Sequence, residues 1–569
     1  SFTFSAGDNI YFKKGETWRE KLTVPSSGSS GTPITFGAYG SGNAPIITGA
    51  DSMSGFSDGG SNIWDKTGVT TQPNVVIVNG ADPQAMAASR AAVTSVGSWF
   101  WGSDTLSVYA TSDPSGNVEA GQRASAIDTN GKNYLTFIGL TLKRSNALHT
   151  VGGGGLWAHN QPSTIIVDSC TITQNAGVGI LIGGTSGAFT TQNSTLTYNG
   201  ENAIYTNNID NENQYILNNT IANNGWGAGA ASGFGSGFQG RIKTGEIANN
   251  TIYSNGSAGP SGTQHGVYPG NQANSTLTIH DNEIYGQTNG AGITVKQSAT
   301  IYNNNIHDNS TGISASDNST NDVTYVIHHN LIANNSSTGL KEESAGAGSV
   351  TLRAYNNTIY NNGDTGNGSV KISDNLSELD FRNNIVSISA GLRIVWLNAL
   401  QTGTVNINNN LYYQPSDSTP FRSVSTELDF AGWKALGYDS SGLNTDPVFV
   451  NPGTNFRLDS SSPAINTGTD VGLSSDYIGT SIPQGSAPDI GAYESLVPVV
   501  ASTGLSKASG NAQATKRFLQ ERGFLPPEKS STEDLLRQIR ELQLRVIDLA
   551  KRLVEVLQEQ VRQRSLQSA

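Results

Sequence analysis

One cysteine, few charged residues and no long apolar run characterise this sequence of 569 residues. Since a disulfide needs two cysteines, Cys170 alone excludes an intramolecular disulfide framework, and we expect a small buried side chain there rather than a nucleophile. No stretch of about 18 apolar residues occurs, so we expect no membrane span. The 7 histidines show neither HxH nor HExxH spacing, which removes the usual signatures of a zinc site. The function must therefore be sought in short repeated patterns.

Negative charge predominates in most of the chain. The formal net charge is −12, and residues 501–569 carry +4, so the remainder carries −16. An acidic surface repels phosphate groups, so we expect no nucleic-acid partner. An acidic polysaccharide is disfavoured for the same reason unless basic side chains gather in one groove.

The composition suits a protein that works outside the cell. Only 14% of the residues are charged, and Gly, at 66 residues, is abundant alongside Asn, Ser and Thr. The sequence begins at Ser1 within the strand-like segment Ser-Phe-Thr-Phe, so we expect that a signal peptide has been removed. We therefore predict an extracellular or cell-surface location.

The strongest signal in the sequence is a short pattern that returns about every 26 residues between positions 170 and 412. Each copy has a small polar residue, then any residue, then an aliphatic or aromatic one. A repeat of this length with strand-like apolar alternation is typical of a β-solenoid. Asn suits such a corner because it tolerates left-handed backbone angles and because its amide can bond the equivalent amide one coil away. The copies begin at Cys170, Ser194, Asn219, Asn250, Asn282, Asn304, Asn330, Asn357, Asn384 and Asn410.

These repeats predict an all-β fold, a β-solenoid. After residue 498 the composition changes to Gln, Arg, Glu and Leu, and we expect an α-helical tail there. Each coil is expected to contribute three short parallel strands, stacked about 4.8 Å from the next coil. We divide the chain into irregular N-terminal coils over residues 1–130, a regular solenoid over 131–415, a closing segment over 416–498 and a helical tail over 499–569.

Segments at both ends of the solenoid resemble a known superfamily. Residues 6–18 (AGDNIYFKKGETW) and 33–40 (PITFGAYG) are similar to the first coils of secreted right-handed parallel β-helix proteins of the pectate-lyase-like superfamily. Residues 446–449 (DPVF), 462–466 (SPAIN) and 489–494 (DIGAYE) resemble the closing segment of the same proteins. The resemblance covers residues 1–498 and implies a right-handed parallel β-helix. It does not choose an activity, because the superfamily includes lyases, hydrolases, adhesins and structural spikes.

The tail carries a coiled-coil pattern. We expect a short helix over residues 512–522 and a longer amphipathic helix over 531–563, which begins with a capping box at Ser531. Apolar residues in the longer helix recur at alternating spacings of four and three, which predicts a seam between helices of different chains and hence a homo-oligomer or polymer. The alternative is that this helix folds back onto its own solenoid. The seam residues are Leu535, Ile539, Leu542, Val546, Leu549, Leu553 and Val556.

Aligning the coils by the repeat places polar and aromatic residues in one outward column. The strand that carries the column reads Gly-Val-Tyr at 266–268 and Gly-Leu-Lys at 339–341. Rings at one end of such a column can stack on sugars, and cations at the other end can pair with carboxylates. The carbohydrate-binding candidates are Tyr205, Tyr268, Lys341, Lys371 and Arg393, with Thr294 and Ser314 between them.

Catalysis on such a glycan would need more than binding. A lyase acting on uronates needs a base, and a cation or Ca²⁺ that acidifies the C5 proton. Lys296 and Lys341 are the candidates for the base, and His265 is a candidate for acid–base chemistry. The oxygen ligands of a Ca²⁺ ion would come from Asp317, Glu342 and Glu343. Without lyase activity, we expect these charged residues to be solvated and the chain to need no cofactor.

Three functions fit these patterns. The first is an extracellular structural or surface-assembly protein, a rigid β-helix whose C-terminal helices join subunits in a filament, sheath or spike. The second is a secreted polysaccharide lyase acting on uronate-containing glycans, and the third is a non-catalytic glycan-binding adhesin. The lack of a carboxylate cluster that recurs on neighbouring coils favours the first, and the resemblance supports the second.

Overall fold

The computed structural model describes residues 3–495, apart from 161–163, 184–186, 208–212, 228–232, 259–262, 271, 318, 345, 347 and 389–390. The chain divides into two compact units, Ser1–Pro498 and Val499–Ala569. The predicted tail helices over 512–522 and 531–563 and their heptad seam lie outside the described residues, so they stay predictions.

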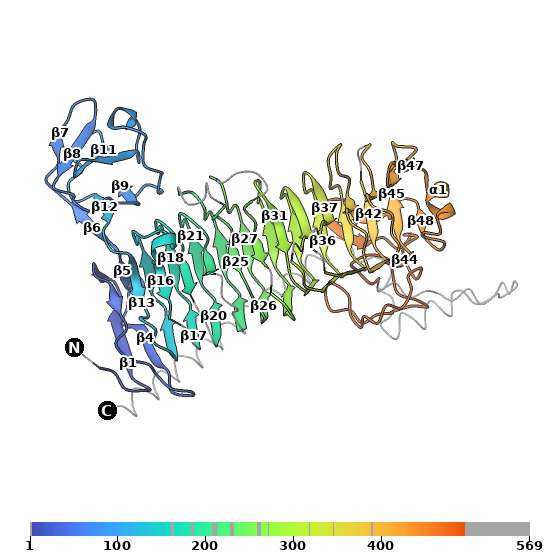
Figure 1. Cartoon of the computed structure of the whole chain (residues 1–569), viewed down its shortest axis with the longest axis horizontal. Helices are drawn as coiled ribbons and strands as arrows, with labels where there is room; N and C mark the ends of the chain where they lie inside the picture. Colours follow the sequence, from blue (N-terminus) through green and yellow to red (C-terminus); the bar gives the residue numbers. More distant parts are fainter. Residues whose placement is uncertain are drawn as a thin grey trace, which may run out of the picture. The chain divides into compact units, whose positions relative to one another are not determined.

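The first unit is dominated by a parallel β-solenoid, which confirms the predicted fold class for this part of the chain (Figure 1). Three sheets of 13, 14 and 14 strands run along it, and successive coils contribute neighbouring strands to each sheet. We name them sheet A, sheet B and sheet C in the order in which the chain visits them.

Sheet A has strands of four to six residues with alternating burial. In β35, Val323, Tyr325 and Ile327 point inward, and the residues between them face outward, because successive side chains of a strand point to opposite faces. The strands are β1 (Asn9–Lys13), β4 (Ile34–Tyr39), β14 (Leu135–Ile138), β17 (Ile165–Asp168), β20 (Ala188–Gln192), β23 (Asn213–Leu217), β26 (Thr244–Ala248), β29 (Thr276–His280), β32 (Ala299–Tyr302), β35 (Val323–His328), β38 (Val350–Tyr355), β41 (Glu378–Arg382) and β44 (Thr404–Asn408).

Sheet B has strands of two or three residues, most with a buried aliphatic residue in the middle. The strands are β2 (Thr17–Trp18), β5 (Ile46–Thr48), β15 (Thr141–Lys143), β18 (Thr171–Thr173), β21 (Thr195–Thr197), β24 (Thr220–Ala222), β27 (Thr251–Tyr253), β30 (Glu283–Tyr285), β33 (Asn305–His307), β36 (Leu331–Ala333), β39 (Thr358–Tyr360), β42 (Ile385–Ser387), β45 (Leu411–Tyr413) and β48 (Leu443–Asn444).

Sheet C carries the outward column predicted from the sequence. The 3-10 turn η2 (His149–Val151) precedes its third strand. The strands are β3 (Leu22–Thr23), β13 (Ser125–Asp128), β16 (Gly154–Ala158), β19 (Ile180–Gly183), β22 (Ile204–Asn207), β25 (Phe238–Gly240), β28 (Val267–Pro269), β31 (Ala291–Val295), β34 (Thr311–Ala315), β37 (Thr338–Glu342), β40 (Val370–Ile372), β43 (Val395–Leu397), β46 (Phe421–Ser423) and β47 (Thr426–Leu428).

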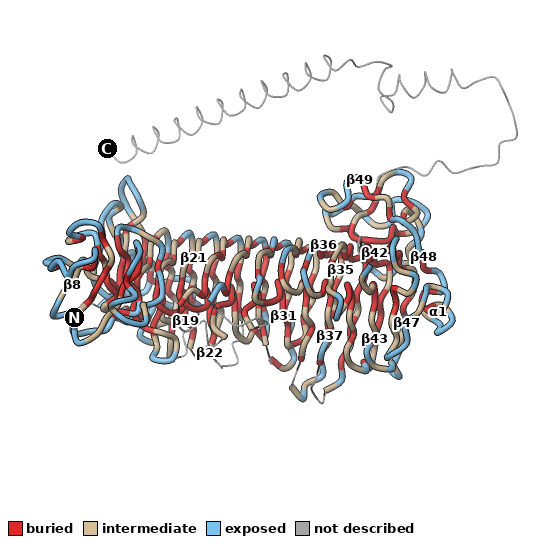
Figure 2. Tube along the Cα trace, turned by 90° about the horizontal axis from the view of Figure 1, so that it is seen from above, coloured by how far each residue is buried: buried red, intermediate tan, exposed pale blue. Residues whose placement is uncertain are grey.

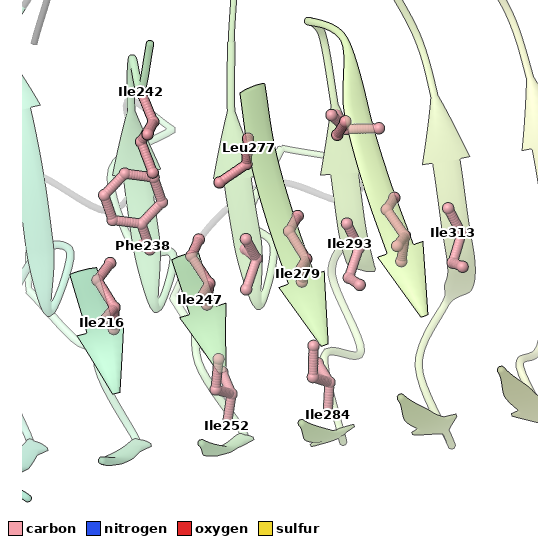
Figure 3. Packing of buried hydrophobic residues seen from close by; sticks show 14 of the residues in the cluster. Ile216, Phe238, Ile242, Ile247, Ile252, Leu277, Ile279, Ile284, Ile293 and Ile313 are labelled. Atoms are coloured by element: carbon pink, nitrogen blue, oxygen red, sulfur yellow. The ribbon is translucent and has the colours of Figure 1, made fainter. Parts of the chain in front are cut away.

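The core is a stack of aliphatic side chains inside the solenoid. Ile216 pairs in register with Ile247, and Ile247 pairs with Ile279, so equivalent residues of successive coils lie directly beside one another (Figure 3). Side chains from sheets B and C meet this row from the other walls of the coil. The β-branched isoleucine suits both the strand backbone and the close contact between coils.

The predicted amide ladder is present and buried. The side-chain amide of Asn304 donates to Oδ1 of Asn330 at 2.9 Å, and Asn330 donates in the same way to Asn357 at 3.0 Å. The left-handed conformation, however, belongs to the residue before each of these asparagines, such as Asn303 (φ 53°) and His329 (φ 51°). The prediction that the ladder residue itself is left-handed is therefore wrong: its amide turns inward, while the preceding residue makes the bend.

A second buried ladder, which the sequence analysis missed, lies five residues after the first. Asn199 donates its side-chain amide to Asn224 at 2.8 Å, and Asn335 donates to Asn362 at 2.8 Å. The two ladders flank the short strands of sheet B, such as β36 between Asn330 and Asn335. The second ladder comprises Asn175, Asn199, Asn224, Asn255, Gln287, Asn309, Asn335 and Asn362.

Residues 50–121 form an antiparallel module inserted between two coils, not irregular coils as the sequence predicted (Figure 1). The module has its own core around Trp99 and Leu106, and both side chains are fully buried. Coils stack regularly before and after it, because β14 pairs directly with β4. Its elements are β6 (Ala50–Met53), β7 (Ser57–Asp58), β8 (Ile63–Thr67), β9 (Val76–Val78), η1 (Arg90–Ala92), β10 (Trp99–Gly102), β11 (Thr105–Tyr109) and β12 (Val118–Gly121).

The other end of the solenoid is closed by a short helix and a returning segment. Helix α1 (Phe430–Ala435) buries Trp433 against Phe421. Asp439 ends the first ladder by accepting hydrogen bonds from the backbone and side-chain amides of Asn410. The strands β49 (Phe449–Asn451) and β50 (Asn455–Leu458) then pack with later residues against the outer face of sheet B (Figure 2).

Candidate functional site

The outward column of sheet C is continuous in register. Ser314 pairs with Lys341, which pairs with Lys371, and Lys371 pairs with Trp396. The sequence alignment placed Arg393 in the position that Trp396 occupies, so that assignment is wrong by three residues. The inward-facing Val395 and Leu397 fix the register, since they continue the buried rows of Val370 and Ile372. Trp396 is thus a column residue that the sequence analysis missed.

Arg393 nevertheless lies near the column. Its guanidinium carbon is 5.4 Å from the Trp396 ring centroid, and it pairs with Glu427 at 2.8 Å. Lys371 and Arg422 also approach the indole ring, at 4.4 and 4.8 Å. The cations on the two neighbouring strands occupy the space over the ring, so Trp396 contributes more to packing than to an open stacking surface.

A cleft of about 420 Å³ lies over the middle of this column. Five residues singled out from the sequence line it, although they lie in or next to three different strands, β28, β31 and β37: His265, Tyr268, Lys296, Lys341 and Glu343. Hydroxyl groups from Thr294 and Ser314 lie between the aromatic and the cationic ends. Stacking of coils about 4.8 Å apart brings residues that are distant in sequence into one site.

A second cleft of about 200 Å³ continues the first, because Tyr268 and Lys296 line both. It extends toward Gln239 and Arg241 on the preceding coils. From β22 to β37 the two clefts cross six strands of sheet C, a span of roughly 24 Å at the usual strand spacing. The site is therefore an elongated groove across the strands, which we call the sheet C groove.

The groove is basic although the chain is acidic. Among the described residues that line it are the cations Arg241, Lys296 and Lys341 and one carboxylate, that of Glu343. Glu343 forms an ion pair with Lys341. Lys296 forms no ion pair with any described residue, and its ammonium lies 5.2 Å from the centroid of the Tyr268 ring. The local surplus of positive charge supplies the basic groove that an acidic polysaccharide requires.

His265 is buried at the floor of the groove. Its Nδ1 accepts a hydrogen bond from the backbone N–H of Ala291 at 3.0 Å and lies 3.1 Å from the Thr294 hydroxyl. Burial, together with the nearby charge of Lys296, lowers the pKa of His265 to about 3. A ring that stays neutral, with one nitrogen already bonded, suits the support of Tyr268 better than general acid catalysis.

Tyr205 does not offer an open stacking surface. Only 7% of the residue is exposed, because Phe234 packs edge-on against its ring at 5.3 Å and His149 lies at 5.6 Å. Tyr205 still lines the second cleft along with Arg241. Of the two rings predicted to stack on sugars, Tyr205 is buried and Tyr268 is half-exposed.

The predicted calcium ligands do not come together. Glu343 is exposed in the groove, whereas Glu342, the next residue of the chain, points into the solenoid and is fully buried. Asp317 is also buried, and its carboxylate accepts hydrogen bonds from Ser319. In the described part of the chain, no three His, Cys, Asp or Glu side chains form a group that could hold a metal ion. The alternation of a strand separates Glu342 from Glu343.

Glu342 should make stability depend on pH. Burial is the main cause that raises its pKa from 4.5 to about 7, and the nearby charge of Asp374 adds to the shift. Because the folded state then holds the proton more tightly than the unfolded state, the free energy of unfolding should fall as pH rises from about 4.5 to 7. Glu342→Gln should remove this fall and raise the free energy of unfolding at pH 8 by about 1–3 kcal/mol. Urea titrations between pH 4 and 8 measure it, and Glu343→Gln, on the exposed face, should leave the profile unchanged.

Comparison with known proteins agrees with this fold. The family described as the right handed beta helix region matches residues 117–267 and 243–411, which together span more than half of the 569 residues. The chain therefore belongs to the right-handed β-helix family. No curated protein matches the sequence.

Solved structures share the architecture at low sequence identity. The structure of XylC in complex with xylose superposes with a TM-score of 0.51 at 14% identity, covering 86% of this chain and 93% of that one. Pectate lyase Pel9A gives a TM-score of 0.36 at 14% identity over 86% and 88% of the two chains. A glycoside hydrolase gives 0.41 at 9% identity over 61% and 89%. At 14% identity, the similarity to XylC shows the fold alone.

None of the helices in the described residues is both long and apolar enough to cross a membrane.

Proposed function

We propose that this chain is an extracellular β-helix protein that binds an acidic polysaccharide along the sheet C groove. The observation that supports this most is the convergence of Tyr268, Lys296 and Lys341 on one cleft, with Glu343 as the single carboxylate among its lining residues. Among the described residues one cation, Lys296, lies over the Tyr268 ring, whereas three lie over that of Trp396, so the half-exposed Tyr268 can still offer an apolar face to a sugar. Lys296 and Lys341 supply partners for carboxylates.

The shape of the groove suits a chain better than a single sugar. It crosses several coils, and cations lie both beside the Tyr268 ring, where Lys296 is found, and further along, at Lys341. The Ser314 hydroxyl can bond a sugar hydroxyl without adding charge, whereas the Thr294 hydroxyl is buried against His265. A uronate polymer presents the matching series of ring faces, hydroxyls and carboxylates.

Titration calorimetry with a uronate polymer and with a neutral polymer of similar length tests this proposal. We expect the uronate polymer to bind and the neutral one to bind far more weakly. The affinity should fall when salt is raised from about 0.05 to 0.5 M, because screening weakens exposed ion pairs. Equal binding of the two polymers, or none of the uronate polymer, would contradict the proposal.

Lyase activity is a second candidate, favoured by Lys296 beside Tyr268, because its ammonium forms no ion pair with any described residue. In its neutral form, Lys296 would take the C5 proton of a uronate. The C5–H electrons would form the C4=C5 double bond as the C4–O bond breaks, and the departing sugar oxygen would gain a proton from water. Hydrolysis fits less well, since it usually needs two carboxylic groups and Glu343 supplies the one carboxylate among the described residues that line the groove. Ultraviolet absorbance of the unsaturated uronate reports the lyase reaction, and binding without new absorbance excludes it.

Assembly through the C-terminal helices is a separate proposal, based on the heptad spacing of Leu535, Leu542 and Leu549 with the residues between them. We expect the full chain to form oligomers or filaments and a chain ending at residue 498 to remain monomeric. Light scattering and negative-stain electron microscopy measure both. Monomers from the two chains would contradict assembly and leave the glycan proposal unaffected.

A further inference from the structure

A second basic cleft lies far from the sheet C groove in the sequence, where the inserted module meets the first coils. It has a volume of about 370 Å³. The solenoid contributes Arg19, Lys143 and Arg144, and the module contributes Glu119 from β12. Asn79 and Asn117 also line the cleft.

Its cations outnumber its carboxylates. Arg19 donates to Oε1 of Glu119 at 2.5 Å, and the Arg144 guanidinium contacts the other oxygen of the same carboxylate. Arg144 is only 7% exposed and is held from behind by two hydrogen bonds to Oε1 of Gln174, at 3.0 and 2.9 Å. Two guanidinium groups thus share one carboxylate.

Lys143 is the third cation, and it forms no ion pair with any described residue. It extends from the outer face of β15, half-buried beside the cleft. Burial and then the charge of Arg19 lower the pKa of Lys143, and the same causes lower that of Arg144 to about 10. Burial is the main cause of both shifts, and the second cause shows that the charge of Arg19 lies close to both groups.

We propose that this cleft binds an oxyanion group, such as sulfate, phosphate or carboxylate, with Lys143 and Arg144 as its main partners. The guanidinium of Arg144, which is fixed by Gln174 and contacts Glu119, adds a positive charge at the wall of the cleft without a change of conformation. Lys143 contributes a charge that no described protein group neutralises. The asparagine amides can donate to the remaining oxygens. The proposal does not depend on the sheet C groove, because the two sites share no lining residue.

The test uses variants that change the charge of the cleft in opposite directions. Binding of inorganic sulfate and phosphate to the full chain is followed by calorimetry and by thermal unfolding, with chloride at the same ionic strength as reference. We expect sulfate to raise the melting temperature above the chloride value. Lys143→Gln should weaken binding at least tenfold, whereas Glu119→Gln should tighten it several-fold. Lys132→Gln, which removes one positive charge outside the cleft, should change it less than twofold.

The outcomes separate a real site from general charge effects. The proposal is overturned if sulfate and chloride act alike on the wild-type chain, or if Lys143→Gln and Lys132→Gln bind sulfate equally. Should Glu119→Gln fail to fold, Lys143→Gln still decides, since its half-buried side chain has no ion pair to lose. A sulfated disaccharide that binds more tightly than free sulfate identifies a sugar-borne group, and equal affinities identify the free anion.

Discussion

Replacing Lys296 and Lys341 together by Met is expected to weaken binding of a uronate polymer about a hundredfold. Each ammonium that pairs with a carboxylate contributes about 1.5 kcal/mol, and two such losses correspond to about two orders of magnitude in Kd. Met keeps the unbranched stem, so the groove retains its shape. Calorimetric titration measures the change, and Lys132→Met, which removes a charge outside the groove, serves as the matched control.

Variants of Tyr268 test separately whether the polymer stacks on its ring. Tyr268→Ala should cost about tenfold in affinity through loss of the stacking face, whereas Tyr268→Phe should stay within threefold of the wild type. If the double lysine variant and Lys132→Met lose affinity equally, binding depends on net charge rather than on the groove. If Tyr268→Ala binds like the wild type, the glycan does not lie over this ring.

Asn330→Ala is expected to lower the free energy of unfolding by about 4 kcal/mol, which is an exceptional loss for one substitution. The side chain of Asn330 donates to the carbonyls of Ile301 and His328 and to Asn357. Its Oδ1 accepts from the backbone and side chain of Asn304. Alanine would leave these partners buried without hydrogen bonds, at a cost of about 1–3 kcal/mol for each group that water cannot reach.

Chemical denaturation of the full chain measures this loss. The control is Asn334→Gly, because Asn334 is exposed and left-handed (φ 54°), a conformation that glycine adopts readily. That substitution should change stability by less than about 1 kcal/mol. Equal effects of the two substitutions would show that the buried ladder adds little to stability.

The ladder was predictable because a buried amide that repeats in every coil leaves a period in the sequence. The backbone conformation at each ladder corner was harder to predict. The Asn304 side chain is buried in the ladder, whereas Asn303 adopts the left-handed backbone conformation. The sequence shows two adjacent asparagines and does not distinguish these two roles. The second ladder was within reach, because Asn199, Asn224 and Asn335 lie five residues after ladder positions. The regular spacing was the available signal.

Register was harder to predict where loops differ in length. Gly391-Leu392-Arg393 resembles the triplets of earlier coils, yet it is Val395, three residues after Leu392, that enters the buried row. The alternation of Val395, Trp396 and Leu397 was the better guide, since two inward aliphatic residues fix a strand more firmly than one. The inserted module was missed for a related reason: its strands show the same apolar alternation as solenoid strands.

The part of the groove that depends only on the stacking of coils could be predicted from the sequence. Tyr268, Lys296 and Lys341 converge because each coil adds one strand to sheet C. The cover over Tyr205 could not be inferred in this way, because Phe234 reaches it from a loop outside the repeat. The neutral state of His265 likewise depends on depth, which a column alignment does not give.

A crystal structure of the full chain with a bound uronate oligosaccharide tests the central claim most directly. We predict a sugar ring over Tyr268, with carboxylates near the ammonium groups of Lys296 and Lys341, and an oligosaccharide axis that crosses the strands of sheet C. An oligosaccharide bound elsewhere on the solenoid, with the sheet C groove empty, would contradict the account.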